Sequence, residues 1–483
     1  MTSDQTNPPT TRLAWETLLE LDGRGGLVEQ LERAVRDAVR TGRAPAGAAL
    51  PPSRRAAEAL GVSRWVVTEA YGQLVGEGLL EARTGSTTRV AADAGTADRP
   101  GAHRSADVVR DGPPRARLDL APGIPDLRHV PRAAWLRAAR EALAVAPADA
   151  LAGAPVAGHA TTRAALAGHL RRSRLVDAPD DAVLLLRGAT HGMAVVGAAL
   201  VTAGHTHVLV EDPSWPVLRE VARRAGLEPV PVPVDAGGVV VDALEAAARR
   251  TGARAALLTP AHQFPTGTAL APDRRARVLA WAREVDGLVV EDDYDAEFRY
   301  DRRPVAALQR LDPDRVVLLG SLSKTLAPAF GLGWAVTPPR WAGRLLAAAG
   351  RAGSGPSTVD QLAFAQLVAG GAYDRHLRAT RARYRRRRDA LVHSLAARLP
   401  TATPSGLAAG MHLLLDLGPD APDAADVVRH AGERDVAVVD LRRYQVEAAE
   451  RSRTLVLGYG NLADARVDEA VARLAASVRA AGG

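Results

Sequence analysis

Cysteine is absent from this sequence of 483 residues, and lysine occurs only once. Without a thiol the chain has no disulfide, no thiolate metal site and no cysteine nucleophile. No apolar run reaches the roughly 18–20 residues that a membrane helix requires, and the N-terminus lacks the apolar core of a signal peptide. These absences predict a cytoplasmic protein, and the length predicts two or three domains.

The single lysine is informative because arginine is abundant. Of the 62 Lys and Arg residues, 61 are Arg and one is Lys324. Arginine supplies a positive charge equally well, so a position that keeps lysine is expected to need its amine. A lysine amine can lose its proton and attack an aldehyde, whereas a guanidinium group stays protonated up to about pH 12. Lys324 is therefore a candidate for covalent chemistry, with survival by chance as the alternative.

The formal net charge of +7 does not by itself indicate a nucleic-acid partner. Residues 1–90 contain eleven Arg and eleven Asp or Glu, so their net charge is zero. The excess lies further along the chain and includes RARYRRRR at 381–388. Such a run is usually the solvated face of a helix, and phosphate contact is the alternative.

The N-terminal part of the chain has the pattern of a winged helix-turn-helix. Apolar residues at helical spacing over Leu27–Val39 predict a first helix. Ser53 and Ser63 are expected to cap two shorter helices, with Gly61 turning the chain between them. Leu79–Val90 alternates around a Thr-Gly-Ser tip and predicts a two-stranded wing.

The remainder of the chain alternates apolar strands with amphipathic helices. This pattern predicts an α/β fold with a parallel-type sheet, followed by a small α+β C-terminal lobe from about residue 390. The predicted strands are 183–186, 207–210, 255–259, 287–292 and 315–320. The expected organisation is a DNA-binding domain at 12–90, a linker rich in Ala, Gly and Pro at 91–117, and a large domain at 118–483.

Two motifs that follow predicted strands suit the phosphate and the ring of a flat cofactor. RGATHG, residues 187–192, opens a helix, so the backbone N–H groups near Ala189 and Thr190 can cradle a phosphate. EDPSWP, residues 211–216, places Trp215 where it can stack on a ring. A tryptophan that only fills the core is the alternative for Trp215.

Two further motifs provide the chemistry of a pyridine ring and an aldehyde. In EDDYD, Asp292 at a strand end can keep a pyridine nitrogen protonated, and Tyr294 points to the same side and can bond the ring hydroxyl. In GSLSKTLAP, the hydroxyls of Ser321 and Ser323 can bind phosphate oxygens on either side of Lys324. The set predicts pyridoxal 5′-phosphate (PLP) as a Schiff base on Lys324.

The segment 42–86 resembles the winged-helix domain of GntR-type regulators over its whole length. This arrangement suits contact with DNA, since a recognition helix reaches base edges through its first residues and a Gly-containing wing approaches the minor groove. Trp65 is unusual, and both stacking on DNA and packing inward are open. The residues implied to face DNA are Arg54, Ser63, Arg64, Trp65 and Thr68, with Thr84 and Gly85 at the wing tip.

The large domain resembles fold-type I aminotransferases, since TPAHQFPTG at 259–267 resembles their Asn-Pro-Thr-Gly turn with Phe264 replacing Asn. A GntR-like winged helix, a linker and such a domain together resemble the MocR subfamily of transcriptional regulators, over roughly residues 12–480. The resemblance implies binding to double-stranded promoter DNA, and PLP as sensor or effector. It also implies a head-to-tail homodimer in which each DNA-binding domain crosses to the partner's large domain.

Three positions depart from the family's pattern. Gly331 stands where an Arg usually clamps the PLP phosphate, and Ala189 stands where the cradle often has Ser. Val456 occupies the position of the Arg that holds a substrate carboxylate. These changes predict a catalytically impaired sensor that responds to PLP itself, as a PdxR-like regulator of vitamin B6 metabolism would. The alternatives are an active aminotransferase with an auxiliary winged helix, a regulator sensing an amino-acid–PLP adduct, and a sensor that no longer binds PLP.

Overall fold

The computed structural model describes residues 15–82, 87–92, 116–300, 306–353 and 355–482. The chain forms two compact units, Met1–Pro113 and Pro114–Gly483, each of which has its own core. Most of the predicted linker at 91–117 lies outside the described residues, as do the predicted wing-tip residues Thr84 and Gly85. No helix in the described ranges is long and apolar enough to cross a membrane.

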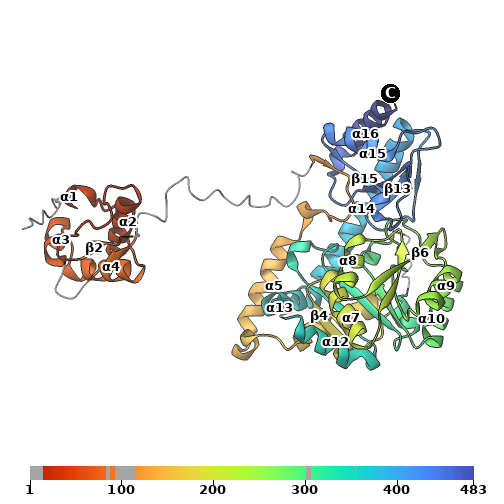
Figure 1. The fold of residues 1–483 in the computed structure, drawn as a ribbon, viewed down its shortest axis with the longest axis horizontal. Helices are drawn as coiled ribbons and strands as arrows, with labels where there is room; N and C mark the ends of the chain where they lie inside the picture. Colours follow the sequence, from red (N-terminus) through yellow and green to blue (C-terminus); the bar gives the residue numbers. More distant parts are fainter. Residues whose placement is uncertain (1–14, 83–86, 93–115, 301–305, 354, 483) are drawn as a thin grey trace, which may run out of the picture. The chain divides into compact units, whose positions relative to one another are not determined.

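The N-terminal unit has the helices and the antiparallel strand pair of a winged helix-turn-helix, as predicted (Figure 1). Its elements are α1 (Trp15–Leu18), α2 (Leu27–Arg40), α3 (Ser53–Leu60), α4 (Arg64–Gly76), β1 (Leu80–Glu81) and β2 (Arg89–Val90). Leu31 and Val35 of α2 are buried together with Val67 and Leu74 of α4. This packing fixes α4 by its apolar side, so its polar side stays exposed.

The turn between α3 and α4 follows the sequence closely. Gly61 ends α3 in the left-handed region with φ +64°. Ser63 caps α4 as predicted, because its hydroxyl accepts a hydrogen bond from the third backbone N–H beyond it at 3.3 Å. The prediction that Ser53 caps α3 is wrong. Pro52 holds the N-cap position, and the Ser53 hydroxyl instead accepts a hydrogen bond from Nε of Arg64 at 3.3 Å.

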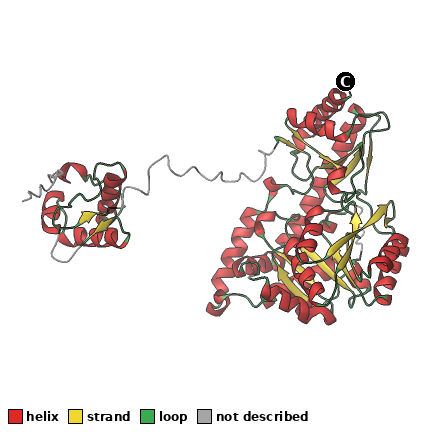
Figure 2. Ribbon diagram, viewed as in Figure 1, coloured by secondary structure: helices red, strands yellow, loops and turns green. Residues whose placement is uncertain are grey.

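The large domain is built on an eight-stranded sheet with the order β4-β11-β10-β9-β8-β5-β6-β7 (Figures 1 and 2). The five predicted strands are all present, as β4, β5, β8, β9 and β10. The sheet is mixed rather than wholly parallel, because β11 runs antiparallel to both of its neighbours. The strands are β4 (Val183–Leu186), β5 (His207–Asp212), β6 (Glu228–Asp235), β7 (Gly238–Val239), β8 (Ala255–Leu258), β9 (Leu288–Asp292), β10 (Val316–Ser321) and β11 (Gly333–Val336).

Strand β6 was not predicted because three prolines interrupt its sequence, EPVPVPVD. Pro229, Pro231 and Pro233 alternate along the strand. In a parallel pair, alternate residues point their backbone groups to opposite sides, so all three prolines direct their missing N–H to the same side. Only two residues of β6 pair with β7 on its outer side, so β6 is close to the sheet edge and loses few ladder bonds.

Helices cover both faces of the large sheet and form a hydrophobic core on each. Alternate residues of a strand pack into these two cores in turn. On β9, Val290 packs in a cluster with α7, α8 and α12, whereas Val289 packs in a cluster with α9 and α10. Both residues are fully buried. The helices of this domain are α5 (Arg132–Val145), α6 (Ala160–Arg174), α7 (Ala189–Thr202), α8 (Pro216–Arg224), α9 (Val241–Thr251), α10 (Pro272–Glu284), α11 (Leu308–Leu311), α12 (Pro339–Arg351) and α13 (Thr358–Ala369).

The C-terminal lobe has the predicted α+β character and contains a four-stranded sheet of order β12-β13-β16-β15. Strand β14 pairs instead with β3, at the start of the unit, so the chain segment before α5 is tied to this lobe. The elements are β3 (Leu118–Asp119), α14 (Ala372–Arg398), β12 (Thr403–Ser405), β13 (His412–Asp416), α15 (Ala424–Glu433), β14 (Val436–Ala437), β15 (Val439–Asp440), β16 (Thr454–Gly458) and α16 (Val467–Ala481).

The arginine-rich run on α14 is only partly a solvated face. Arg385 and Arg386 are exposed, as the run predicts. Arg387, in contrast, is buried and donates to Asp126 Oδ2 and to Asp464 Oδ1, both at 2.7 Å. The helical period explains the difference, since a long helix that packs on one side must turn some residues of any run inward.

Candidate functional site

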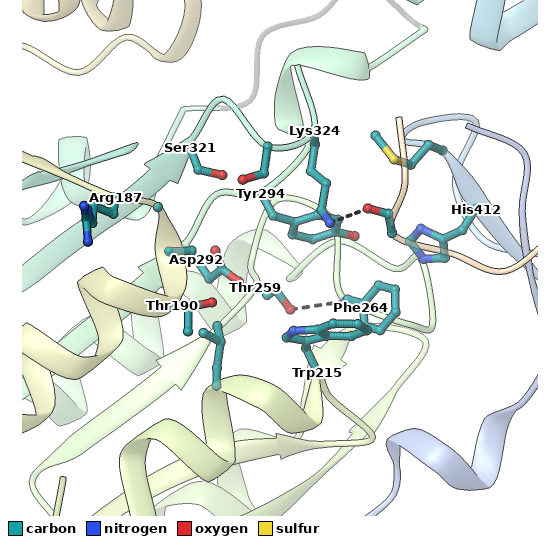
Figure 3. A pocket seen from close by; sticks show the side chains of 16 residues that line it. Arg187, Thr190, Trp215, Thr259, Phe264, Asp292, Tyr294, Ser321, Lys324 and His412 are labelled. Carbon is teal, nitrogen blue, oxygen red and sulfur yellow. Dashed lines mark hydrogen bonds between the residues drawn. The ribbon is translucent and has the colours of Figure 1, made fainter. Parts of the chain in front are cut away.

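All eight residues predicted to bind the cofactor line one pocket of the large domain. Its volume is about 850 Å³ including the open mouth, which is enough for a cofactor of PLP size. The carboxyl ends of β4, β5, β8, β9 and β10 meet at this edge of the sheet. The eight residues are Ala189, Thr190, Trp215, Asp292, Tyr294, Ser321, Ser323 and Lys324. Figure 3 shows most of them around a common space.

Lys324 projects from the turn that follows β10. Its Nζ donates a hydrogen bond to the carbonyl oxygen of Gly123 at 2.5 Å (Figure 3). Burial lowers the pKa of the lysine amine, and the negative charges of Asp292 and Asp295 partly offset this effect. A lowered pKa favours the neutral amine, which is the nucleophilic form.

Asp292 ends β9 and lies at the floor of the pocket. Its Oδ1 is buried and has no hydrogen-bond partner among the described residues. Burial raises the pKa of Asp292 to about 7, and the neighbouring carboxylate of Asp293 adds to the rise. A buried acceptor without a donor is costly. A protonated pyridine nitrogen would supply both the donor and the opposite charge, so this atom fits PLP.

Tyr294 is held by a buried polar pair that the sequence did not indicate. Its hydroxyl lies 3.1 Å from Nδ1 of His262, and the same nitrogen lies 2.9 Å from Oδ2 of Asp295. His262 and Asp295 are both almost fully buried. Gly410 allows this arrangement, since a Cβ there would lie 2.4 Å from Asp295 Oδ2. The pair fixes the Tyr294 ring beside the space that the cofactor ring would fill.

The phosphate end of the pocket is a turn that leads from β4 into α7. Gly188 is the N-cap residue with φ +129°, and Ala189 and Thr190 begin the helix. Gly333 of β11 packs directly on this turn, because a Cβ at Gly333 would lie 2.6 Å from Cα of Gly188. The first turn of α7 therefore faces the pocket beside Ser321 at the end of β10, and its first N–H groups have no partner within the helix.

The opposite end of the pocket is aromatic and apolar. Trp215 lies edge-on to Phe264, with their ring centroids 5.5 Å apart. Val456 does not itself line the pocket; it is fully buried in a cluster with Phe264 and Tyr444, and its strand neighbours on either side are Leu414 and Val439. Apart from Lys324 and Arg187, no Lys or Arg of the described residues lines the pocket. The position at which the family pattern places a carboxylate-binding Arg is thus enclosed by hydrocarbon.

Both domains of the chain match families of known proteins. Residues 117–474 match the family model described as aminotransferase class I and II, and residues 27–90 match bacterial regulatory proteins of the gntR family. The chain is 34% identical to the HTH-type pyridoxine biosynthesis transcriptional regulator PdxR of Corynebacterium glutamicum, over 80% of this chain and 82% of that protein. The chain belongs to the MocR subfamily of GntR-type regulators.

The MocR-type chain is also similar to a second regulator and to a solved enzyme structure. It is 33% identical to the probable rhizopine catabolism regulatory protein MocR of Rhizobium meliloti, over 78% of each chain. The solved structure of LysN, an α-aminoadipate aminotransferase from Thermus thermophilus, is 26% identical with a TM-score of 0.68 and covers 75% of this chain and 92% of LysN. The LysN structure was determined with N-(5′-phosphopyridoxyl)-L-leucine, a phosphopyridoxyl compound.

Several pocket residues of this MocR-type protein were not predicted from the sequence. Gly123 and His412 come from segments without a recognisable motif, at the entry to the domain and in the C-terminal lobe. Arg187 and Phe264 belong to motifs that were recognised, but they were given no place in the pocket. Arg187 is the only one of them with a charge, and its position beside the phosphate turn was available from the sequence.

The predicted DNA-facing residues within the described ranges lie on the exposed side of the winged helix. Arg54, Arg64 and Thr68 are exposed, and so is Ser63 at the helix cap. Trp65 is 67% exposed, so the alternative in which it packs inward is wrong for this MocR-type chain. An exposed tryptophan on the first turn of α4 remains available for contact with a partner.

Proposed function

We propose that this MocR-type protein is a PLP-responsive transcriptional regulator that binds promoter DNA through its winged helix. The large domain holds PLP as a Schiff base on Lys324. The observation that carries the proposal is the presence in one pocket of Lys324 and of Asp292, whose Oδ1 has no hydrogen-bond partner among the described residues. Those two groups match the aldehyde and the pyridine nitrogen of the same small molecule.

In this proposal the other pocket residues orient the cofactor. Trp215 stacks on the ring, Tyr294 bonds the ring hydroxyl, and Ser321 and Ser323 bind the phosphate with the α7 N-terminus at Ala189 and Thr190. The bound group supplies an electron sink through its protonated ring. The proposed DNA contacts are Arg54, Ser63, Arg64, Trp65 and Thr68, together with the wing tip.

A DNA-binding measurement tests the regulator function. We expect the fluorescence anisotropy of labelled DNA from the chain's own upstream region to rise with protein, and the apparent Kd to change when PLP is added. Arg64→Ala should weaken binding about tenfold or more in both conditions, since a bidentate base contact contributes roughly 1–3 kcal/mol. An apparent Kd that PLP leaves unaltered would contradict the sensor role. Glu69→Ala, also exposed on α4, is the control.

We further propose that the large domain is impaired as an aminotransferase and that PLP itself is the effector. The support is the apolar surround of Val456, which offers no counter-charge to a substrate carboxylate. Positioning of the substrate accounts for a large part of such catalysis. Control of vitamin B6 metabolism is the corresponding role, as the name of the Corynebacterium glutamicum relative suggests.

Transamination has a direct test. Mixing PLP-loaded protein with each of a panel of amino acids should give no conversion of the cofactor to pyridoxamine phosphate within minutes. Val456→Arg tests the reason, since it introduces the missing cation. Rapid conversion by the wild-type protein would favour the second candidate, an active aminotransferase with an auxiliary winged helix. The similarity to LysN is the observation that supports that candidate.

A further inference from the structure

The phosphate end of the pocket lacks a fixed cation at the expected place. Gly331 ends a short turn at Pro328–Phe330, with φ +52° in the left-handed region. A Cβ at Gly331 would meet nothing within 4 Å, so the space at the first side-chain carbon is open. A phosphate held only by hydroxyls and N–H groups would have no cationic partner, and so no bidentate ion pair.

Arg187 is placed to supply that contact. It is the first residue after β4 and lines the same pocket as Ser321, Ser323 and Thr190. Figure 3 shows it on the side of Ser321 and Thr190, across the pocket from His412, with its guanidinium group turned outward in this conformation. Apart from Lys324, it is the only Lys or Arg among the described pocket residues.

The side chain of Arg187 is free to bind an anion. It is exposed, and no carboxylate lies within ion-pair distance of it among the described residues, although many Arg side chains of this chain have such partners. A guanidinium group that stays charged and unpaired beside a helix N-terminus adds to the same positive field. Both features attract a phosphate dianion.

The backbone that carries Arg187 is fixed, although the side chain is not. The Arg187 N–H donates to Nδ1 of His191, in the first turn of α7, at 3.2 Å. Burial lowers the pKa of His191, and the charge of Arg187 lowers it further, so the ring stays neutral and able to accept this bond. The next residue, Gly188, is packed against Gly333. The backbone of Arg187 is therefore held beside the phosphate turn, and rotation of the exposed side chain brings the guanidinium group toward it.

We propose that Arg187 is the charged phosphate anchor of this site and makes the sensor selective for phosphorylated over unphosphorylated pyridoxal. The inference deepens the proposed function and rests on it. It also explains how a chain with Gly331 in place of an Arg keeps a site for a phosphorylated cofactor, since the cation enters from β4 instead of from the segment after Lys324.

The test compares two ligands that differ by the phosphate group alone. The affinities of PLP and pyridoxal are measured by quenching of intrinsic tryptophan fluorescence in the full chain. Arg187→Ala should weaken PLP about 10- to 100-fold and leave pyridoxal within about twofold. Arg187→Lys should fall between the wild type and Arg187→Ala. Arg249→Ala, at an exposed position on α9, is the matched control and should change neither affinity.

The possible outcomes separate this inference from the proposed function. Equal weakening of both ligands by Arg187→Ala, or no weakening beyond that of Arg249→Ala, overturns the role of Arg187 while leaving PLP as the ligand. A wild-type protein that binds neither ligand overturns the PLP site as a whole, and the anchor with it. A melting temperature equal to that of the wild type shows that each variant is folded.

Discussion

Lys324→Ala should abolish the visible absorbance of PLP-treated protein and lower its affinity for PLP by about 100-fold or more. The loss is expected to be complete because the chain has no second lysine that could form the bond in its place. Borohydride reduction of the loaded wild type, followed by peptide mass spectrometry, should place the phosphopyridoxyl group on the peptide that contains Lys324.

Lys324→Arg separates the amine from the charge. The variant keeps a cation beside Gly123 and Asp292, but a guanidinium group does not form the Schiff base. If Lys324→Arg retains the visible band, the covalent role of this residue is wrong. If it retains affinity without the band, the pocket binds PLP through noncovalent contacts as well.

The second large effect is structural and concerns Arg387. Arg387→Met should destabilise the large domain by about 3–5 kcal/mol, because it leaves Asp126 charged, buried and without its main partner. The variant also removes the donor to the carbonyl oxygen of Tyr459 at 2.9 Å. Denaturant unfolding followed by circular dichroism measures the change in the free energy of unfolding.

The controls for Arg387 lie on the same helix. Arg386→Met, at an exposed position of the same run, should change the free energy of unfolding by less than about 0.5 kcal/mol. Combining Arg387→Met with Asp126→Asn should cost less than the sum of the two single changes, since the buried charge is then gone. Equal effects of Arg386→Met and Arg387→Met would contradict the burial of this ion pair.

The sequence was most informative where local patterns determine the position of a residue. Asp292, Ser321 and Thr190 follow predicted strands, and the carboxyl ends of parallel strands meet at one edge of a sheet. These residues could therefore be brought together without a structure. The helix-turn-helix was equally accessible at the Ser63 cap and the Gly61 turn, because both depend on neighbouring residues, although the predicted cap at Ser53 was wrong.

The sequence was least informative where distant segments meet. Gly123 reaches Lys324 from a position 201 residues away, and no local pattern marks it. His412 enters the pocket from the C-terminal lobe for the same reason. Arg387 differs from these, since Tyr373, Leu377, Tyr384 and Leu391 form a buried stripe at helical spacing that passes through it. The spacing of these residues could have predicted that Arg387 is buried, but the run of neighbouring arginines favoured the interpretation as a solvated face.

The single lysine also makes this protein selectively reactive toward reagents that modify side-chain amines. Every other basic side chain, histidine aside, is a guanidinium group, so Lys324 is the only side-chain amine that acylating or carbamylating reagents can modify. That amine lies inside the pocket, where an occupant would shield it. The fraction of chains in which Lys324 is protected from an amine reagent therefore reports directly on how many sensors are filled, with no background from other lysines.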